Sequence, residues 1–370
     1  MKVKTVLKGA VAAGALSVGA ASAEMTNEIV VVSWGGAYQA SQVNAYLLPY
    51  QAMNPEFSFI MDESSAEAVA RLRAMAEANN LTWDLVDVEA ADALRLCDEG
   101  LAMPLDHDTM LAAAPDGTLA SVDFGDTLVS ECFIPQIVFS TTFAYRTDLM
   151  PEGVDAPTDA CAVFDTETFP GRRALERRPI GNMEWALICD GVAMEDVYDT
   201  LETDEGVARA LAKLDTIKDQ VDWWTAGAET PQWLAEGSVV MGSGYNGRFF
   251  AALAEQDVPL GMAWGYQMLD VDGWIIPTGI SDETLARVTD FLVFATDTQR
   301  LADQAGYISY GPARASSAEL VGDHLELGIP MAPHMPTDPA NMEGAFVTNY
   351  MWWADFRDEM DARFQAWLAQ

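Results

Sequence analysis

The chain has 370 residues and a formal net charge of −37, with 57 acidic against 20 basic residues. So much negative charge repels a polyanion, so we expect no nucleic acid partner. It would attract a cationic ligand, although a salt-adapted surface has the same composition. The length predicts two domains, and a hydrophobic content of 50% is ample for two cores.

Residues 1–23 have the pattern of a cleaved signal peptide. Three lysines precede a short apolar stretch, and Ala21-Ser22-Ala23 is a cleavage motif before Glu24. The apolar stretch is too short to span a membrane, and no cysteine follows the motif to carry a lipid. The sequence therefore predicts a periplasmic protein whose charge becomes −40 once the leader, with its three lysines and no acids, is removed.

The first strand–helix unit contains the first candidate site. Ile29–Val32 is a β-branched run typical of a buried parallel strand, and Ser33-Trp34-Gly35-Gly36 ends it. From about Ala37 the spacing of Val43, Leu47, Tyr50 and Met53 predicts a helix. In open α/β sheets ligands bind at the carboxyl ends of strands.

That turn has the residues of a ligand wall. Gly35 and Gly36 let the backbone approach a ligand closely, and Trp34 and Tyr38 add aromatic faces beside it. The alternative is that Trp34 covers the top of the core. We take Trp34 as one wall of a ligand site.

Strands and helices alternate along the rest of the chain, which predicts an α/β fold with parallel pairing. The expected strands are Phe57–Met61, Asp84–Glu89, Phe133–Tyr145, Val239–Met241, Leu260–Tyr266 and Val271–Pro277. The main expected helices are Ala66–Asn79, Ala91–Asp98, Asn182–Asp190, Pro231–Glu236, Phe249–Gln256, Glu283–Ala305 and Asn349–Leu368, with another around Val207–Leu214. Phe133–Tyr145 is long enough to cross between two domains.

Motifs for catalysis or cofactors are weak. Gly242–Gly247 fits G-x-G-x-x-G, but the acid that a dinucleotide site needs about 20 residues later is missing, so we interpret it as a tight turn between strand and helix. The three histidines have no metal-ligand spacing, and we expect no cofactor and no enzyme activity. Four cysteines in an exported chain favour disulfides, with three pairings open.

Aromatic and acidic residues gather at predicted turns and strand ends. Such a set is what an aromatic box for an organic cation requires, since rings bind cations through their faces and carboxylates add charged hydrogen bonds. The members that we select as candidates are Trp34, Tyr38, Glu89, Tyr245, Asp270, Asp272, Trp274 and Tyr307.

On these motifs the chain resembles the periplasmic solute-binding proteins of bacterial ABC importers, in the spermidine/putrescine-binding group. The resemblance covers nearly the whole mature chain and rests on Ser33-Trp34, Asp84-Leu-Val, Phe169-Pro-Gly171, Tyr245-Asn-Gly247, Asp272 with Trp274-Ile-Ile-Pro277, and Gly306-Tyr307 to Gly311-Pro312. It implies a two-lobed periplasmic binding protein fold of type II, with two strands crossing the hinge and the ligand enclosed between the lobes.

The resemblance also implies roles for single residues. Trp34 matches a position that stacks on a polyamine, Tyr245 an aromatic of the second lobe, and Asp272 an aspartate that holds an ammonium group. The chain departs from the group at Glu89 and around Arg178, where Glu184 is the nearest acid. Because Arg178 and the Gly35-Gly36 turn suit an anionic group, a zwitterionic amine acid or a quaternary amine is the alternative to a polyamine. An exported enzyme using the same cleft is the competing class.

We expect a monomer that binds a small molecule and docks on membrane permease subunits. The predicted first lobe comprises residues 24–138 and 278–345, and residues 139–277 form the second lobe with hinge crossings at both ends, near 139–142 and 271–277. Residues 346–370 are a C-terminal helix on the outside. The disulfides are predicted as Cys97–Cys132 and Cys161–Cys189, each within one lobe, because a bridge between lobes would block hinge motion.

Overall fold

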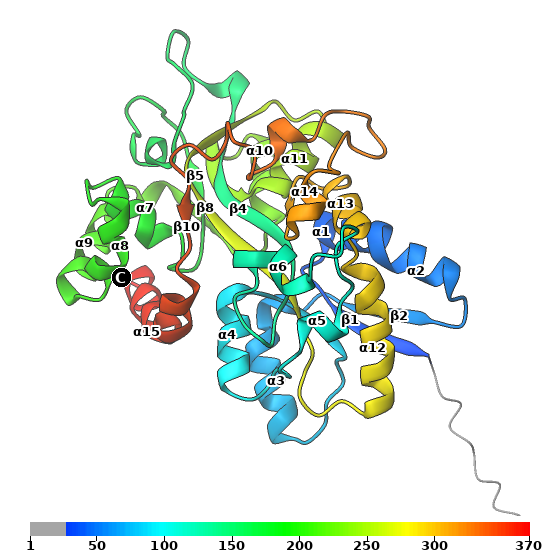
Figure 1. The fold of residues 1–370 in the computed structure, drawn as a ribbon. Helices are drawn as coiled ribbons and strands as arrows, with labels where there is room; N and C mark the ends of the chain where they lie inside the picture. The colour runs from blue at the N-terminus through cyan, green and yellow to red at the C-terminus, as the bar shows by residue number, and fades with distance from the viewer. Residues whose placement is uncertain (1–26) are drawn as a thin grey trace, which may run out of the picture.

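The computed structural model describes residues 27–370, which form a two-lobed α/β fold (Figure 1). The predicted signal peptide, residues 1–23, lies outside the described residues. Across the described part of the chain, no helix is both long and apolar enough to cross a membrane. The predicted two-lobed fold class is confirmed.

One mixed sheet runs through the molecule in the order β2-β1-β3-β8-β4-β7-β5-β6, with the short β9 and β10 at the sides of β4 and β8. β1 pairs in parallel with β2 and β3, and β5 pairs in parallel with β6 and β7. The strands are β1 (Glu28–Val32), β2 (Ser58–Asp62), β3 (Leu85–Glu89), β4 (Ile134–Arg146), β5 (Arg173–Glu176), β6 (Val221–Trp224), β7 (Met241–Tyr245), β8 (Leu260–Ile275), β9 (Gly311–Pro312) and β10 (Phe346–Val347).

β4 and β8 are the two long strands that join the lobes, and they lie antiparallel in the middle of Figure 1. Their pairing runs from Ile134↔Trp274 at one end to Arg146↔Leu260 at the other, with an irregularity between Thr141 and Phe143. The sequence predicted two strands, Leu260–Tyr266 and Val271–Pro277, where the structure has one. Met268, Leu269 and Asp270, which lie between the two predicted strands, pair with β4, and Met268 and Leu269 also pair with β10 on the other side, so the strand continues without a break.

Helices cover both lobes. The first lobe contains β1, β2 and β3, and the second lobe contains β5, β6 and β7. The principal helices are α1 (Gly36–Gln42), α2 (Leu48–Met53), α3 (Ala68–Glu77), α4 (Ala90–Asp98), α7 (Asn182–Ile188), α8 (Val197–Leu201), α9 (Asp204–Asp215), α10 (Glu229–Glu236), α11 (Asn246–Glu255), α12 (Asp282–Ala295), α13 (Thr298–Ala305) and α15 (Tyr350–Leu368). Shorter ones are α5 (His107–Met110), α6 (Ala120–Phe124) and α14 (Ala315–Ala318).

The first helical segment buries most of the stripe that its spacing predicted. Leu47 and Tyr50 are buried and Val43 packs against the same core, whereas Met53 is 60% exposed. A π-helical turn, Val43–Leu47, separates α1 from α2. One extra residue per turn rotates the following face, so Tyr46 is buried as well.

The predicted helix Glu283–Ala305 is two helices. α12 ends at Ala295, and Asp297 caps the start of α13 by accepting a hydrogen bond from the backbone N–H of Gln299. An Asp at this position satisfies a free N–H group of a new helix, which explains the break within an otherwise continuous apolar pattern.

Each lobe has its own core. In the first lobe the buried side chains of β1 and β3 pack on α12, with Trp274 and Phe291 at the centre. In the second lobe β4 and β5 pack against α7 and α9 through residues such as Phe143 and Leu175. The cavity described below lies between these cores.

α15 lies against both lobes, between α4 and the α7–α9 group (Figure 1). Trp353 of α15 is fully buried, and its indole N–H donates to Glu184 of α7 at 2.7 Å. On the side of the first lobe, Asp358 pairs with Arg95 of α4 at 2.8 Å. The helix predicted to cover the outside therefore also bridges the lobes.

Both predicted disulfides are confirmed. Cys97 at the end of α4 bonds to Cys132 before β4, with an S–S distance of 2.04 Å. Cys161 bonds to Cys189 at the end of α7, at 2.03 Å. The first bridge is in the first lobe and the second in the second lobe, so neither ties the lobes together.

Candidate functional site

The turn after β1 is a point of close approach between the lobes. Gly35 and Gly36 have φ angles of 66° and 59°, in the left-handed region that favours glycine. A Cβ on Gly36 would lie 2.7 Å from a guanidinium nitrogen of Arg248, which comes from α11 of the second lobe. Arg248 Nη2 donates to the carbonyl oxygens of Trp34 at 3.1 Å and Gly35 at 3.4 Å.

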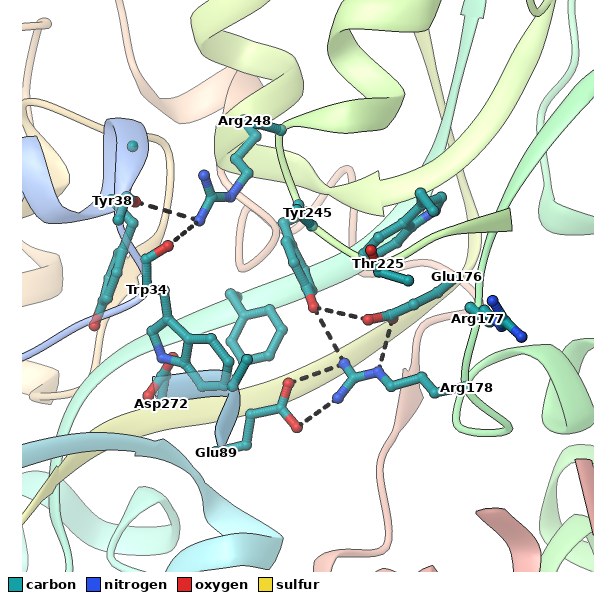
Figure 2. A pocket seen from close by; sticks show the side chains of 18 of the residues that line it. Trp34, Tyr38, Glu89, Glu176, Arg177, Arg178, Thr225, Tyr245, Arg248 and Asp272 are labelled. Atoms are coloured by element: carbon teal, nitrogen blue, oxygen red, sulfur yellow. Dashed lines mark hydrogen bonds and ion pairs between the residues drawn. The ribbon is translucent and has the colours of Figure 1, made fainter. Parts of the chain in front are cut away.

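A cavity of about 690 Å³ opens between the lobes beside this turn. Both lobes and α15 line it, and Figure 2 shows the side chains from the two lobes pointing toward one another. Eight of the twelve candidate residues lie in its wall: Trp34, Gly35, Gly36, Tyr38, Glu89, Arg178, Tyr245 and Asp272.

The other four candidates lie outside the cavity wall. Trp274 is fully buried in the core of the first lobe, against Tyr46 and Phe291. Glu184 accepts hydrogen bonds from the Gly181 N–H and from Trp353, so it holds the start of α7 and α15. Tyr307 packs at the edge of the same core as Trp274.

Asp270, the fourth, is buried on β8 beside a small crevice that Arg178 and Glu176 also line. Burial raises its pKa to about 8, and the nearby Glu89 carboxylate adds to that rise. Asp270 therefore lies close to the cavity but behind its wall.

Arg178 joins the two lobes through a cluster of charged groups. Its Nη1 and Nη2 atoms donate to the two carboxylate oxygens of Glu89 at 3.0 and 2.9 Å, and its Nε lies 2.8 Å from Glu176. Nη2 also donates to the Tyr245 hydroxyl at 3.2 Å (Figure 2). Although burial opposes it, Arg178 and Arg357 together lower the pKa of Glu89. The charge of Arg178 is thus compensated within the protein.

Arg248, by contrast, has no carboxylate within ion-pair distance among residues 27–370. Its acceptors are the two backbone carbonyls of the turn, and its Nε is buried without a hydrogen-bond partner in the described chain. A guanidinium group that lines a cavity without a counter-charge is suited to bind an anionic group of a ligand.

The acidic part of the wall contains Asp272, from β8. Asp272 is 5% exposed, its Oδ1 accepts a hydrogen bond from the Gly273 N–H at 2.8 Å, and its neighbour Asp87 is fully buried on β3. Burial and the neighbouring Asp87 raise the pKa of Asp272 well above its ordinary value. In Figure 2 Trp34 lies between Arg248 on one side and Asp272 and Glu89 on the other.

Several wall residues were not among the candidates. Arg248 lies in the first turn of α11, directly after the Gly242–Gly247 motif, and its place beside Tyr245 was the available signal. Phe139 and Ile137 alternate on β4, and Tyr310 packs on both Tyr38 and Phe139. Glu176 and Trp224 come from the ends of β5 and β6.

α15 supplies three more wall residues, Arg357, Asp361 and Gln365. Their spacing of four places them along one side of a helix. This polar stripe was the sequence signal for a role in the cavity wall, in a segment that we predicted only as a C-terminal helix on the outside.

The wall therefore combines aromatic faces with an uncompensated guanidinium and the carboxyl of Asp272. No group of three or more His, Cys, Asp or Glu side chains in the described chain is arranged to hold a metal ion. These groups can hold a small organic molecule that has both a cationic and an anionic end.

Comparison with known proteins gives consistent matches over most of the chain. The family described as bacterial extracellular solute-binding protein matches residues 45–337. A γ-aminobutyric acid-binding protein of Pseudomonas aeruginosa is 34% identical over 355 residues, which is 96% of this chain and 95% of the relative. The solved Atu4243 GABA receptor is 28% identical with a TM-score of 0.76, covering 93% of this chain and 98% of the receptor.

A periplasmic binding protein from A. tumefaciens R10, solved in complex with agropinic acid, is 26% identical with a TM-score of 0.75, covering 93% of this chain and 99% of its own. A spermidine/putrescine-binding protein from Streptococcus pneumoniae has a TM-score of 0.66 and 14% identity, covering 92% of this chain and 99% of its own, and this likeness shows the fold alone. The expected place within the polyamine-binding group is therefore not supported beyond the fold.

Proposed function

Because this chain belongs to the bacterial extracellular solute-binding proteins, we propose that it captures a zwitterionic amino acid of the γ-aminobutyric acid class for its ABC importer. Membership of the family makes it a substrate-binding protein of an ABC transporter, which binds a small molecule outside the cytoplasmic membrane and delivers it to permease subunits. The ligand is the part that we propose, and the residues in the cavity wall favour a zwitterion.

The observation that carries the proposal is the uncompensated Arg248. An amino acid brings a carboxylate for this guanidinium and an ammonium group for Asp272, while its methylene groups lie on the face of Trp34. A polyamine has a cation at both ends, so it would place positive charge beside Arg248. The likeness to two γ-aminobutyric acid-binding proteins supports the same choice.

We also propose the lobe boundaries given by the sequence, 24–138 with 278–345 and 142–270, with the crossings near 139–142 and 271–277. The long pairing of β4 with β8 supports these crossings. Rotation about them would separate Arg248 from the Trp34 turn and open the cavity.

The test is calorimetry with γ-aminobutyric acid, putrescine, spermidine and glycine betaine on the wild type and on Arg248→Gln. Losing one partner of a buried charge pair costs about 2–5 kcal/mol, so the variant should bind γ-aminobutyric acid at least tenfold more weakly. Putrescine binding should be unchanged or stronger, because a repelling charge is removed.

Arg172→Gln is the matched control, since Arg172 forms an exposed ion pair with Asp222 in the second lobe, away from the cavity. Tight binding of a polyamine, with no binding of any zwitterion, would refute the proposed ligand class. A compound that is chemically changed on incubation with the protein would instead favour an exported enzyme.

A further inference from the structure

The inference concerns Asp87 and Asp272 and rests on the proposed function. β3 and β8 lie antiparallel, with Glu89 opposite Asp272 and Asp87 opposite Trp274. Side chains two residues apart on a strand share a face, so Asp87, Glu89 and Asp272 point to the same side of the sheet. Asp87 and Asp272 are both buried, and each carboxyl shifts the pKa of the other. Two neighbouring carboxylates that are shielded from water repel each other, so such a pair favours holding one proton.

The surroundings of Asp87 show which carboxyl holds that proton. Its Oδ2 accepts hydrogen bonds from the Tyr38 hydroxyl at 3.0 Å, from Gln136 Nε2 at 3.2 Å, and from Gln42 Nε2. Its Oδ1 is buried and has no hydrogen-bond partner in the described chain. The three donors favour the ionised form of Asp87, and the bare Oδ1 leaves a place for a proton carried by Asp272, which lines the cavity.

We propose that Asp87 and Asp272 share one proton in the empty cavity and that the ammonium group of the ligand expels it when it docks on Asp272. The bond that breaks is the Asp272 O–H bond, and the proton leaves to solvent. The ammonium group then supplies the positive charge that separated the two carboxylates. One positive charge enters and one leaves, so the net charge of the buried pair is unchanged.

Other charged groups around the pair do not replace this proton. Glu89 faces Asp272 across the strands, but its carboxylate is taken by Arg178 at 2.9 Å and Arg357 at 3.5 Å. The remaining titratable or charged groups around the pair are Tyr38 of α1, Tyr46 of the π-helical turn, Tyr310 after α13, Arg248 of α11 and Asp270 of β8. Burial raises the pKa values of both members, that of Asp87 to about 6 and that of Asp272 well above its ordinary value, in agreement with a retained proton.

Binding should therefore depend on pH in a definite direction. Because the free protein holds the proton and the complex does not, affinity for an ammonium ligand should rise with pH, by up to about tenfold per pH unit for one proton. A quaternary ammonium group cannot donate a hydrogen bond to either carboxylate, so the pair also favours a primary amine over a methylated one.

The test measures proton release by calorimetry with γ-aminobutyric acid between about pH 5.5 and 7.5, in buffers of different ionisation enthalpy. The wild type should release about one proton per bound ligand. In Asp87→Asn the amide N–H takes the place of the shared proton and the amide oxygen keeps the donors of Asp87. This variant should still bind, release almost no proton, and show a flat pH profile.

Asp270→Asn is the control, because Asp270 is also buried on β8 with a raised pKa but lies behind the cavity wall. It should keep the proton release of the wild type, and if it abolishes release, the assignment to Asp87 and Asp272 is wrong. Tight binding by the wild type without proton release also overturns the inference and leaves the proposed ligand standing.

If no zwitterion binds, the proposed function fails and the proton pair is tested on the ligand-free protein. In infrared spectra at neutral pH, both Asp87→Asn and Asp272→Asn should then lower the protonated-carboxyl absorption by one group, while the absorption of Asp270, whose pKa is raised to about 8, remains. Thermal unfolding checks that each variant is folded. A wild-type spectrum identical to those of the two variants would overturn the inference.

Discussion

The ion pair between Glu89 and Arg178 connects the lobes, so its free energy should appear in ligand binding more than in the stability of the ligand-free protein. Glu89 ends β3 in the first lobe, and Arg178 follows β5 in the second. When the lobes separate the pair must break. A ligand that binds the closed form therefore gains, in binding free energy, the free energy that the pair contributes to closure.

The structure bounds the size of this contribution. The Glu89 side chain is 4% exposed and that of Arg178 is 21% exposed, with both hydrogen bonds at about 3 Å. Close, poorly solvated pairs couple by about 1.5–7 kcal/mol, but Arg178 keeps Glu176 at 2.8 Å and Glu89 keeps Arg357 at 3.5 Å. We therefore expect about 2–3 kcal/mol, or about 30- to 150-fold in affinity.

A double-mutant cycle with Glu89→Gln, Arg178→Gln and both together measures this coupling by calorimetry. Each single variant should bind γ-aminobutyric acid more weakly, and the double variant little worse than either. Asp222→Asn, which breaks the exposed pair with Arg172 inside the second lobe, is the control and should leave affinity unchanged. If the losses of binding free energy in the two single variants add up in the double variant, the two residues contact the ligand separately. If the variants lose as much unfolding free energy without ligand as they lose binding free energy, the pair does not act through lobe closure.

Four further changes should have distinct effects. Trp34→Ala removes the stacking face and should weaken binding by about 1 kcal/mol or more in the same calorimetric assay; unchanged affinity would mean that Trp34 only covers the core. Gly36→Ala forces a side chain into φ 59° and against Arg248, so chemical denaturation should show a loss of about 1–2 kcal/mol. Gly322→Ala should show no such loss, since Gly322 is outside the left-handed region and a Cβ there would meet no atom within 4 Å. Replacing both Cys161 and Cys189 by alanine should lower the unfolding free energy by about 2–4 kcal/mol, and an unchanged midpoint would contradict this. Burial raises the pKa of Glu184 to about 7, so the folded protein binds the proton of this carboxyl more tightly than the unfolded chain does. The stability that this group contributes is therefore lost as pH rises from about 4.5 through 7. Glu184→Gln should flatten that part of the curve of unfolding free energy against pH.

Local patterns in the sequence predicted the features that depend on neighbouring residues. The β-branched run Ile29–Val32 and the turn after it form as expected, because strand burial and glycine conformation are local properties. Gly242–Gly247 connects a strand to a helix as expected, but it is not a separate turn, because β7 continues to Tyr245 and α11 begins at Asn246. The predicted face of the helix after Gly36 is right for Val43, Leu47 and Tyr50 and wrong for Met53, since no local signal indicates the π-helical turn.

The cavity wall needed information that no single segment carries. Arg248 became a candidate for ligand binding only when the lobes brought it against the Trp34 turn, 214 residues earlier in the chain. Asp87 looked like an interior strand residue, and its partner Asp272 lies on another strand that runs in the opposite direction. Trp274 was predicted to bind the ligand because it follows Asp272 by two residues on the same face of the strand. The structure buries it in the core instead.

The arrangement of the two disulfides bears on how the protein matures after export. Each cysteine bonds to the next one along the chain, Cys97 to Cys132 and Cys161 to Cys189. A chain that crosses a membrane from its N-terminus presents its cysteines in that order, so the first pair is available for oxidation before the third cysteine appears. Oxidation in order of arrival thus yields the native bridges directly, and we expect maturation to require an oxidant for thiols but no enzyme that reshuffles disulfides.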